Sequence, residues 1–186
     1  MLTEEELALK LQYGDRNALA ALVKHHHSPL IGFFYRMTDG DRTLAEDLAQ
    51  ETFVRLMRAI HRYEYPRPFK PWLYAIATNL ARDHYKRAET RYHVDAEPDQ
   101  LHQHPAELPE ETLTAADDAR QVVEAITSLP DHQREVVILR YYQELSLAEI
   151  AEALNIPVGT VKSRLSLGLR RLKIVLEREA EPYDEQ

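Results

Sequence analysis

The sequence contains no cysteine and only five glycines among its 186 residues. The absence of cysteine excludes disulfide bonds and cysteine-ligated zinc, and it suits a reducing compartment. No apolar run approaches the roughly 20 residues that a membrane span requires. The acidic start, MLTEEELALK, lacks the apolar block of a secretory signal. We therefore expect a cytoplasmic protein without membrane insertion.

Strand signals are also scarce. The short β-branched run at residues 136–139 (VVIL) lies inside a helical context. Few glycines in a chain rich in leucine and alanine favour helices. The sequence therefore predicts an all-α fold.

The net charge of −8 is unevenly distributed along the chain. Residues 93–118 hold eight acidic side chains and no Lys or Arg, whereas residues 158–173 hold five basic side chains and no acid. Because electrostatic attraction to phosphate decays over a Debye length of about 8–10 Å, the local basic segment matters more than the total charge. A nucleic-acid partner is therefore compatible with an acidic protein.

Three segments and a short tail are predicted from these patterns. Residues 1–92 and 115–178 are dense in helical periodicity and are expected to form two helical domains. Residues 93–114 contain three prolines, many acids and little periodicity, which is typical of a flexible acidic linker. Its acidity has two open interpretations, mimicry of nucleic acid or solubility. Residues 179–186 form the tail.

The clearest helical pattern of the first segment runs over residues 45–60. Side chains at i, i+3 and i+4 spacing predict one buried face: Ala45, Leu48, Ala49, Thr52, Phe53, Leu56, Met57 and Ile60. A second helix is expected over residues 69–87, with Trp72 in the core and a polar, basic end. The two are separated by a proline-rich loop containing Tyr63, Tyr65 and Phe69, whose rings could stack on an unpaired base or simply cover the edge of the core.

The strongest motif covers residues 146–173. Ser146 and Glu149 have capping-box spacing, Asn155 suits a left-handed helix end, and Pro157 suits the start of the next helix. Two helices joined by such a tight turn match a helix-turn-helix. The second helix is expected to enter the major groove, with Thr160, Lys162, Ser163, Arg164 and Ser166 near base edges and Arg170 and Arg171 near phosphates. A basic helix that is only solvated is the alternative interpretation.

Four segments, in this order, resemble the extracytoplasmic-function (ECF, group IV) RNA polymerase sigma factors of the sigma-70 family. They are residues 45–53 (AEDLAQETF), 71–83 (PWLYAIATNLARD), 129–141 (LPDHQREVVILRY) and 156–165 (IPVGTVKSRL). The resemblance covers most of the chain. It implies a sigma-2-type and a sigma-4-type domain that bind the polymerase core and direct promoter-specific initiation.

The resemblance also implies site residues. Asp47, Gln50, Glu51 and Arg55 match the polymerase-facing surface, although an exposed face without a partner would show the same polar pattern. The minus-ten contacts it implies are Tyr63, Tyr65, Arg67, Phe69, Asn79, Arg82, Tyr85, Lys86 and Arg87. The implied partners are the β′ clamp helices and β flap of the polymerase core, promoter DNA and an anti-sigma factor. No cofactor, metal or catalytic residue is implied, so the expected protein is not an enzyme.

One departure concerns the recognition helix. Many family members carry arginine at the second and fourth positions after the Ser-Arg-Leu of this helix, where this chain has Leu167 and Leu169. The residues that read bases in the minus-thirty-five element are therefore uncertain from sequence.

Three rival functions fit the sequence less well. A response regulator would begin with alternating strands and helices, which are not seen here. A metalloenzyme is disfavoured because consecutive side chains at His25, His26 and His27 point about 100° apart on a helix, and His102 and His104 lie in the linker. An adaptor that binds polymerase but not DNA does not account for the basic helix.

Overall fold

The computed structural model describes residues 2–94 and 113–180, and these residues form helices without strands. The all-α prediction is confirmed. The elements are α1 (Glu4–Gln12), α2 (Arg16–Met37), α3 (Arg42–Ala59), the 3₁₀ turn η1 (Ile60–Arg62), α4 (Phe69–Val94), α5 (Leu113–Thr127), α6 (Asp131–Tyr141), α7 (Leu147–Leu154) and α8 (Val158–Ala180). Helix α4 extends beyond the expected end at Arg87. The predicted linker lies almost entirely outside the described residues.

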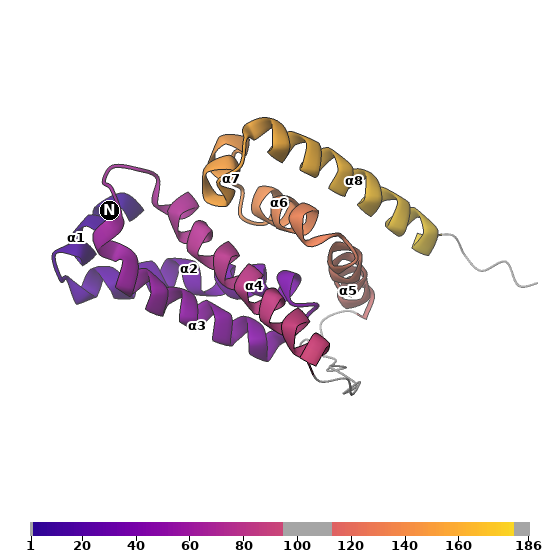
Figure 1. The fold of residues 1–186 in the computed structure, drawn as a ribbon, viewed down its shortest axis with the longest axis horizontal. Coiled ribbons are helices and arrows are strands. Elements are labelled where there is room, and N and C mark those ends of the chain that lie inside the picture. Colours follow the sequence, from indigo (N-terminus) through magenta and orange to yellow (C-terminus); the bar gives the residue numbers. More distant parts are fainter. Residues whose placement is uncertain (1, 95–112, 181–186) are drawn as a thin grey trace, which may run out of the picture.

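The N-terminal half, residues 2–94, is a bundle in which α2 packs on α1 and α3, and α3 packs on α4 (Figure 1). Its helices start where side-chain oxygens cap them. Thr3 and Glu6 form a capping box, and Asp15 and Asp41 accept backbone N–H bonds at the starts of α2 and α3. The core contains fully buried aromatic rings of Phe33, Phe34, Phe69 and Tyr74.

The predicted buried face of α3 is correct with one exception. Ala45, Leu48, Ala49, Thr52, Phe53 and Leu56 are buried, and Ile60 packs against the core. Met57 was expected in this face but is 53% exposed. Because 3.6 residues per turn rotate the apolar stripe along an 18-residue helix, Met57 falls at the stripe's outer edge.

The C-terminal half, residues 113–180, is built around α6. Seven consecutive residues of α6, from Gln133 to Leu139, are buried, so the middle of this helix is covered on every face while its two ends are exposed. Helix α8 and, more weakly, α7 pack on α6 from within this half, and α2 packs on it from the N-terminal half. The charged side chains of Arg134 and Glu135 are therefore buried as well.

Gly168 lies where α8 crosses α6. A Cβ atom at this position would lie 3.0 Å from Val137 Cγ2 and 3.5 Å from Gln133 Cβ. The missing side chain therefore permits the close approach of the two helices. It also fixes the rotation of α8, which turns Leu167 away from α6 and leaves it 46% exposed.

The two halves pack against each other. Helix α4 lies against α7, while α2 contacts α5 and α6. Figure 1 shows α5, α6 and α7 along one side of α2 and α4, with α8 on the far side of α6. Helix α8 is thus the element farthest from the N-terminal bundle, and α4 is the element of that bundle most covered by the second half.

Candidate functional site

The helix-turn-helix is formed by α7 and α8. Both bonds of the predicted capping box are present, since Ser146 N–H donates to Glu149 Oε2 at 2.8 Å and Glu149 N–H donates to Ser146 Oγ at 3.2 Å. Asn155 ends α7 in the left-handed region at φ 53°, as predicted. This tight turn presents the start of α8 to solvent, because Val161 inserts into the core and the polar residues of the same turn point outward.

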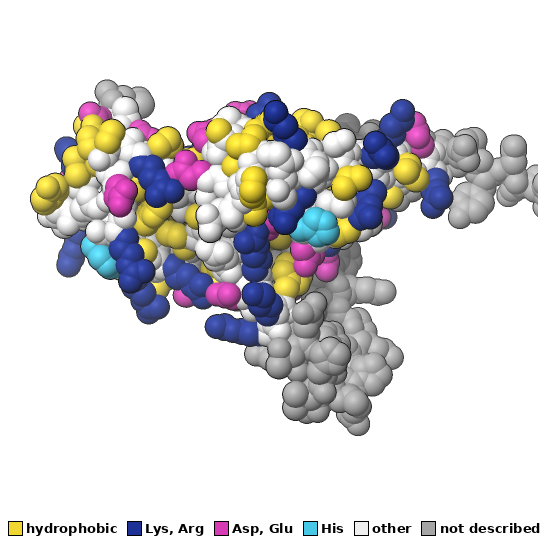
Figure 2. Space-filling model, turned by 45° about the horizontal axis from the view of Figure 1, so that its top comes forward, with side chains coloured by type: hydrophobic (Ala, Val, Ile, Leu, Met, Phe, Trp, Pro, Cys, Tyr) yellow, Lys and Arg dark blue, Asp and Glu magenta, His cyan; other side chains and the backbone are white. Residues whose placement is uncertain are grey.

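The outward face of α8 is polar and basic. Lys162, Ser163, Ser166, Arg170 and Arg171 are exposed, and Thr160 is half-buried. Figure 2 shows Lys and Arg side chains, in dark blue, recurring over this side of the molecule. The Ser163 hydroxyl donates to the Thr160 carbonyl at 3.0 Å, and its oxygen remains able to accept a bond. The arrangement suits insertion into a major groove.

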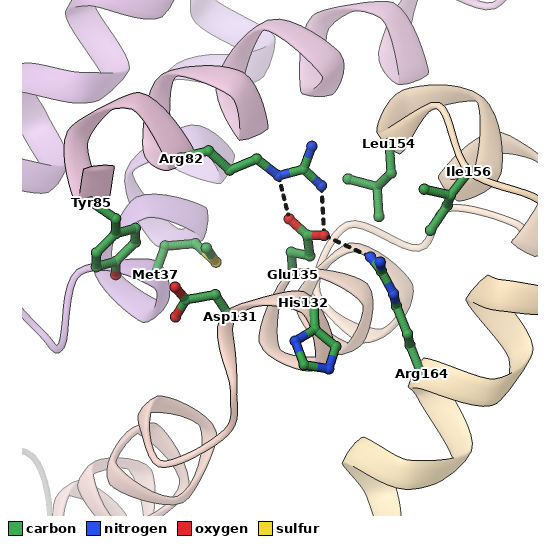
Figure 3. Close-up of a pocket in the computed structure, with 9 residues that line it drawn as sticks. All are labelled: Met37, Arg82, Tyr85, Asp131, His132, Glu135, Leu154, Ile156 and Arg164. Carbon is green, nitrogen blue, oxygen red and sulfur yellow. Dashed lines mark hydrogen bonds and ion pairs between the residues drawn. The ribbon is translucent and has the colours of Figure 1, made fainter. Parts of the chain in front are cut away.

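Arg164 differs from its neighbours, because its side chain turns towards α6. Its Nη1 lies 3.3 Å from Glu135 Oε1, and the guanidinium is only partly exposed (Figure 3). Sequence reasoning placed Arg164 at a base edge, whereas the structure pairs it with a carboxylate of its own domain.

Glu135 is shared with the N-terminal half. Arg82 Nε donates to Glu135 Oε2 at 3.0 Å, and Arg82 Nη2 donates to Oε1 at 2.6 Å. The side chain of Glu135 is 3% exposed. Figure 3 shows Arg82, Glu135 and Arg164 converging at a cavity of about 360 Å³ between the two halves. Its remaining lining residues are Met37, Tyr85, Asp131, His132, Leu154 and Ile156.

Arg134 makes a second connection between the halves. Its Nη1 donates to the Met37 carbonyl at 2.9 Å and lies 3.3 Å from the Tyr85 hydroxyl. Burial is the main cause that raises the pKa of Tyr85 to about 12, so this phenol stays protonated near neutral pH. Tyr85 therefore serves here as an acceptor for Arg134 within the interface.

In the loop before α4, two of the three aromatic rings cover the edge of the core, which is one of the two interpretations of the sequence. Tyr63 and Phe69 are buried with ring centroids 5.8 Å apart, and Trp72 lies 5.3 Å from Tyr63. Burial raises the pKa of Tyr63 to about 12. Long-range bonds explain the burial, because the Gln12 side chain donates to the carbonyls of Ile60 and Tyr63 at 2.8 and 2.6 Å. Tyr65, at 47% exposed, is the ring of this loop that faces solvent.

The remaining residues predicted to contact the minus-ten element are divided between solvent and the interface. Asn79, Lys86, Arg87 and Arg67 are exposed, and Arg67 pairs with Glu152 of α7. Arg82 and Tyr85 face the second half. The structure therefore brings these residues to one side of α4, part of which is covered by α7.

The outer face of α3 combines charge with exposed apolar atoms. Asp47 and Gln50 are exposed, while Arg55 bonds Glu51 at 3.0 Å and Asp83 at 3.2 Å. The hydrogen bond that Arg55 donates to the Glu51 carboxylate is the main cause that raises the pKa of Arg55 above its already high value. Val54 and Met57 lie exposed on this helix, at 40% and 53%.

An apolar groove of about 180 Å³ opens between α5, α6 and α8. It is lined by Val122, Ala125, Ile126, Val137, Tyr141, Tyr142, Leu169, Leu172 and Leu176. Leu169 therefore contributes its side chain to the lining of this groove.

Comparison with known families matches both halves. The family model described as sigma-70 region 2 matches residues 22–91, and the one described as sigma-70, region 4 matches residues 119–172. The chain is 38% identical over 172 residues to the ECF RNA polymerase sigma factor SigW of Bacillus subtilis, with 88% of this chain and 91% of that protein covered. The chain belongs to the ECF sigma factors.

Another relative of this sigma factor is the ECF RNA polymerase sigma-E factor of Haemophilus influenzae, which is 30% identical with 97% of each chain covered. Among solved structures, CnrH in complex with the cytosolic domain of CnrY has a TM-score of 0.73 at 24% identity and covers 95% of this chain and 99% of its own. The RpoE sigma factor of Bartonella quintana, solved with the anti-sigma factor NepR, has a TM-score of 0.67 at 24% identity, with 89% and 98% covered. At these identities, the structures show the shared fold.

Sigma factors bind the RNA polymerase core and promoter DNA, so the chain is a transcription initiation factor rather than a response regulator. Among the described residues, no helix is long and apolar enough to cross a membrane, and no cluster of three or more potential metal ligands occurs. His26 is buried beside Glu4, whereas its neighbour His25 is exposed. His102 and His104 lie outside the described residues.

Sequence reasoning missed several contacts and one exposed side chain of the sigma factor. Glu135, Arg134 and Gln143 connect the two halves, and Met57 is exposed on α3. One usable signal was the pair Arg134-Glu135 directly before the apolar run at residues 136–139. Charged residues are almost never fully buried unless they are paired, so charges drawn into a buried run require partners, which the sequence does not name.

Proposed function

We propose that the outer face of α3 binds the β′ clamp helices of the polymerase core. Asp47, Gln50, Glu51 and Arg55 supply polar contacts, and the exposed side chains of Val54 and Met57 supply apolar area at their centre. A protein interface of this kind joins an apolar centre to a polar rim. Met57→Ala is therefore expected to weaken core binding about tenfold, whereas Arg42→Ala at the start of α3 leaves it unchanged.

Helix α4 and the loop before it bind the minus-ten element. Tyr65 offers an exposed ring for an unpaired base, and the Asn79 amide offers both a donor and an acceptor to a base edge. Arg67, Lys86 and Arg87 are placed to contact the backbone. Tyr63 and Phe69 support the loop from the core, while Arg82 and Tyr85 join the DNA surface only when the second half moves away from α4.

Helix α8 binds the minus-thirty-five element in the major groove. Thr160, Lys162, Ser163 and Ser166 lie in its first two turns, where an inserted helix meets base edges. Arg170 and Arg171, farther along, meet phosphates. Arg164 positions the helix through Glu135, which revises its expected role as a reader of bases.

The apolar groove of α5, α6 and α8 binds a helix of the β flap. The groove is open and its rim contains few charges, so an apolar side chain of the flap can fill it. An anti-sigma factor is a further proposed partner, supported by the solved structure of the related RpoE bound to NepR. The protein acts in the cytoplasm and is not an enzyme.

The single observation that carries this assignment is the exposed basic face of α8 behind a complete helix-turn-helix, in a chain that matches both sigma-70 regions. The test uses gel filtration with polymerase core, followed by footprinting of the complex on promoter fragments. We expect co-elution and protection of two elements. Lys162→Ala should change the preference at one base position, whereas Arg171→Ala should weaken binding evenly and lower the salt slope by about 1. Equal, sequence-independent losses would contradict this division of roles.

A further inference from the structure

The two halves of the molecule share one buried carboxylate. Glu135 lies on α6, yet two guanidinium nitrogens of Arg82 on α4 bond both of its oxygens, at 3.0 and 2.6 Å. Arg164 on α8 bonds Oε1 of the same group at 3.3 Å. Figure 3 shows the carboxylate between the two arginines, one from each half of the chain.

The geometry at Arg82 is the one that arginine uses for phosphate. A guanidinium presents parallel N–H donors that match two oxygens of either a carboxylate or a phosphate. Arg82 lies on α4 among the residues assigned to the minus-ten element, so Glu135 occupies donors that DNA would otherwise use. One group cannot hold both the carboxylate and a phosphate in this bidentate form.

Other contacts close the same interface. The Tyr74 hydroxyl donates to Gln143 Oε1, and both residues are buried. Gln143 Nε2 donates to the Pro29 carbonyl at 3.3 Å, and Arg67 of the minus-ten loop pairs with Glu152 of α7. Arg67 is a second proposed DNA contact held by an acid of the helix-turn-helix half. Two acids of the second half thus pair with two basic residues of the minus-ten surface.

The Glu135 carboxylate remains paired with Arg164 when the two halves separate. Leaving a buried charge unpaired is strongly destabilising, so an interface based on a single ion pair would resist opening. Arg164 belongs to the same half as Glu135 and stays with it, and the adjoining cavity of about 360 Å³ opens to water. Opening therefore releases Arg82 without stranding Glu135.

We propose that Glu135 is an intramolecular competitor for promoter DNA, which holds the free sigma factor closed by occupying Arg82. The inference rests on the proposed role of α4 in minus-ten binding. Release of Arg82 is coupled to separation of the halves, so the closed factor binds DNA poorly and the open one binds it well. The apparent affinity of the free factor is reduced by the fraction of open molecules.

The test compares three single variants of the full chain. Glu135→Gln removes the charge while keeping the shape of the side chain, and Tyr74→Phe weakens the interface without changing any charge. Glu124→Gln is the charge-matched control, because Glu124 is exposed on α5 and its side chain pairs with the exposed Arg120 of the same helix, at 3.4 Å. Because the sequence has no cysteine, spin labels can be attached at Thr43→Cys on α3 and Ala148→Cys on α7, both exposed positions.

Two measurements are made on each variant without polymerase: the label-to-label distance distribution, and the Kd for a promoter fragment with an unpaired minus-ten strand. We expect one short distance in the wild type and the Glu124→Gln control. Glu135→Gln and Tyr74→Phe should show an added longer distance and bind the fragment up to about tenfold more tightly.

Unchanged distances in both interface variants would overturn the proposal. So would opening without tighter DNA binding, or an affinity gain that Glu124→Gln reproduces. If Glu135→Gln fails to fold, the distance distribution and Kd of Tyr74→Phe alone decide whether the proposal stands. Failure of the wild-type complex with polymerase core to bind the same fragment would instead refute the proposed function, since the distance measurement requires no DNA.

Discussion

At the residue scale, two buried charged side chains, Arg134 and Glu135, make most of the polar contacts between α6 and the helices around it. Arg134 is buried on α6, and its guanidinium donates to the carbonyls of Met37 and Leu129 at 2.9 and 3.2 Å. Its neighbour Glu135 is bonded by Arg82 and Arg164. Neither role follows from the sequence alone, because Met37, Arg82 and Arg164 are at least 29 residues away from the residues that they contact. The sequence shows two charges before an apolar run and no partner for them.

The two glycines of α8 predict opposite effects on stability. An alanine Cβ at Gly168 would meet Val137 Cγ2 at 3.0 Å, whereas none of the neighbouring atoms lies within 4 Å at Gly159. Gly168→Ala is expected to lower the free energy of unfolding by about 1 kcal/mol or more, because overpacking exceeds the gain in helix propensity. Gly159→Ala should raise it by about 0.5–1 kcal/mol. Urea unfolding of the pair measures both, and equal effects would show that Gly168 is not a packing residue.

We expect the exposed side chain of Leu167 to contact a thymine methyl group in the minus-thirty-five element. Its side chain is 46% exposed on the side of α8 away from Gly168, near Ser163 and Ser166. An apolar side chain in the major groove reads the C5-methyl group of thymine. Replacing single thymines of the minus-thirty-five element by uracil should therefore weaken wild-type binding at one position, by roughly 1 kcal/mol.

Leu167→Ala supplies the control for this contact. The variant should bind the thymine and uracil fragments equally, because it has lost the apolar partner of the methyl group. Equal sensitivity of the wild type and the variant to uracil would place Leu167 outside the groove.

At the scale of the elements, the sequence predicts helix ends and buried faces well where they depend on residues close together in the chain. The capping box of α7, the left-handed Asn155 and seven of the eight residues assigned to the buried face of α3 are as expected, since each depends on neighbours within one or two turns. Met57 was wrongly placed because it lies at the edge of the stripe. Tyr63 and Phe69 are buried because α1, far away in sequence, holds this loop through Gln12 and Glu5.

The contact between α1 and α2 predicts a dependence of stability on pH. Glu4 Oε1 lies 3.1 Å from Nε2 of the buried His26, and this contact with the imidazole is the main cause that lowers the pKa of Glu4 below its ordinary value of 4.5. A carboxyl with a lowered pKa in the folded state stabilises the fold above its unfolded pKa and loses this effect as the pH falls through the folded pKa. Wild type and Glu4→Gln should therefore differ in free energy of unfolding at pH 6 and converge below pH 4.5. A difference that stays constant down to pH 3 would contradict the pairing.

At the scale of the whole molecule, the arrangement of the two halves is the least predictable feature. The sequence indicates two helical units and an acidic segment between them, and the family models match one region in each. Nothing in the periodicity shows that α7 covers α4. The interface depends on side chains such as Tyr74, Gln143 and Glu135, which pair across separations of 53 residues or more. Such contacts become visible only in three dimensions.

The central claim, that the chain directs polymerase to promoters, is tested most directly by run-off transcription with purified polymerase core and genomic promoter fragments. With the protein added, the account predicts transcripts of defined length that start downstream of paired minus-thirty-five and minus-ten elements. Met57→Ala should reduce their yield, and core alone should give none. Transcripts that are the same with and without the protein would contradict the account.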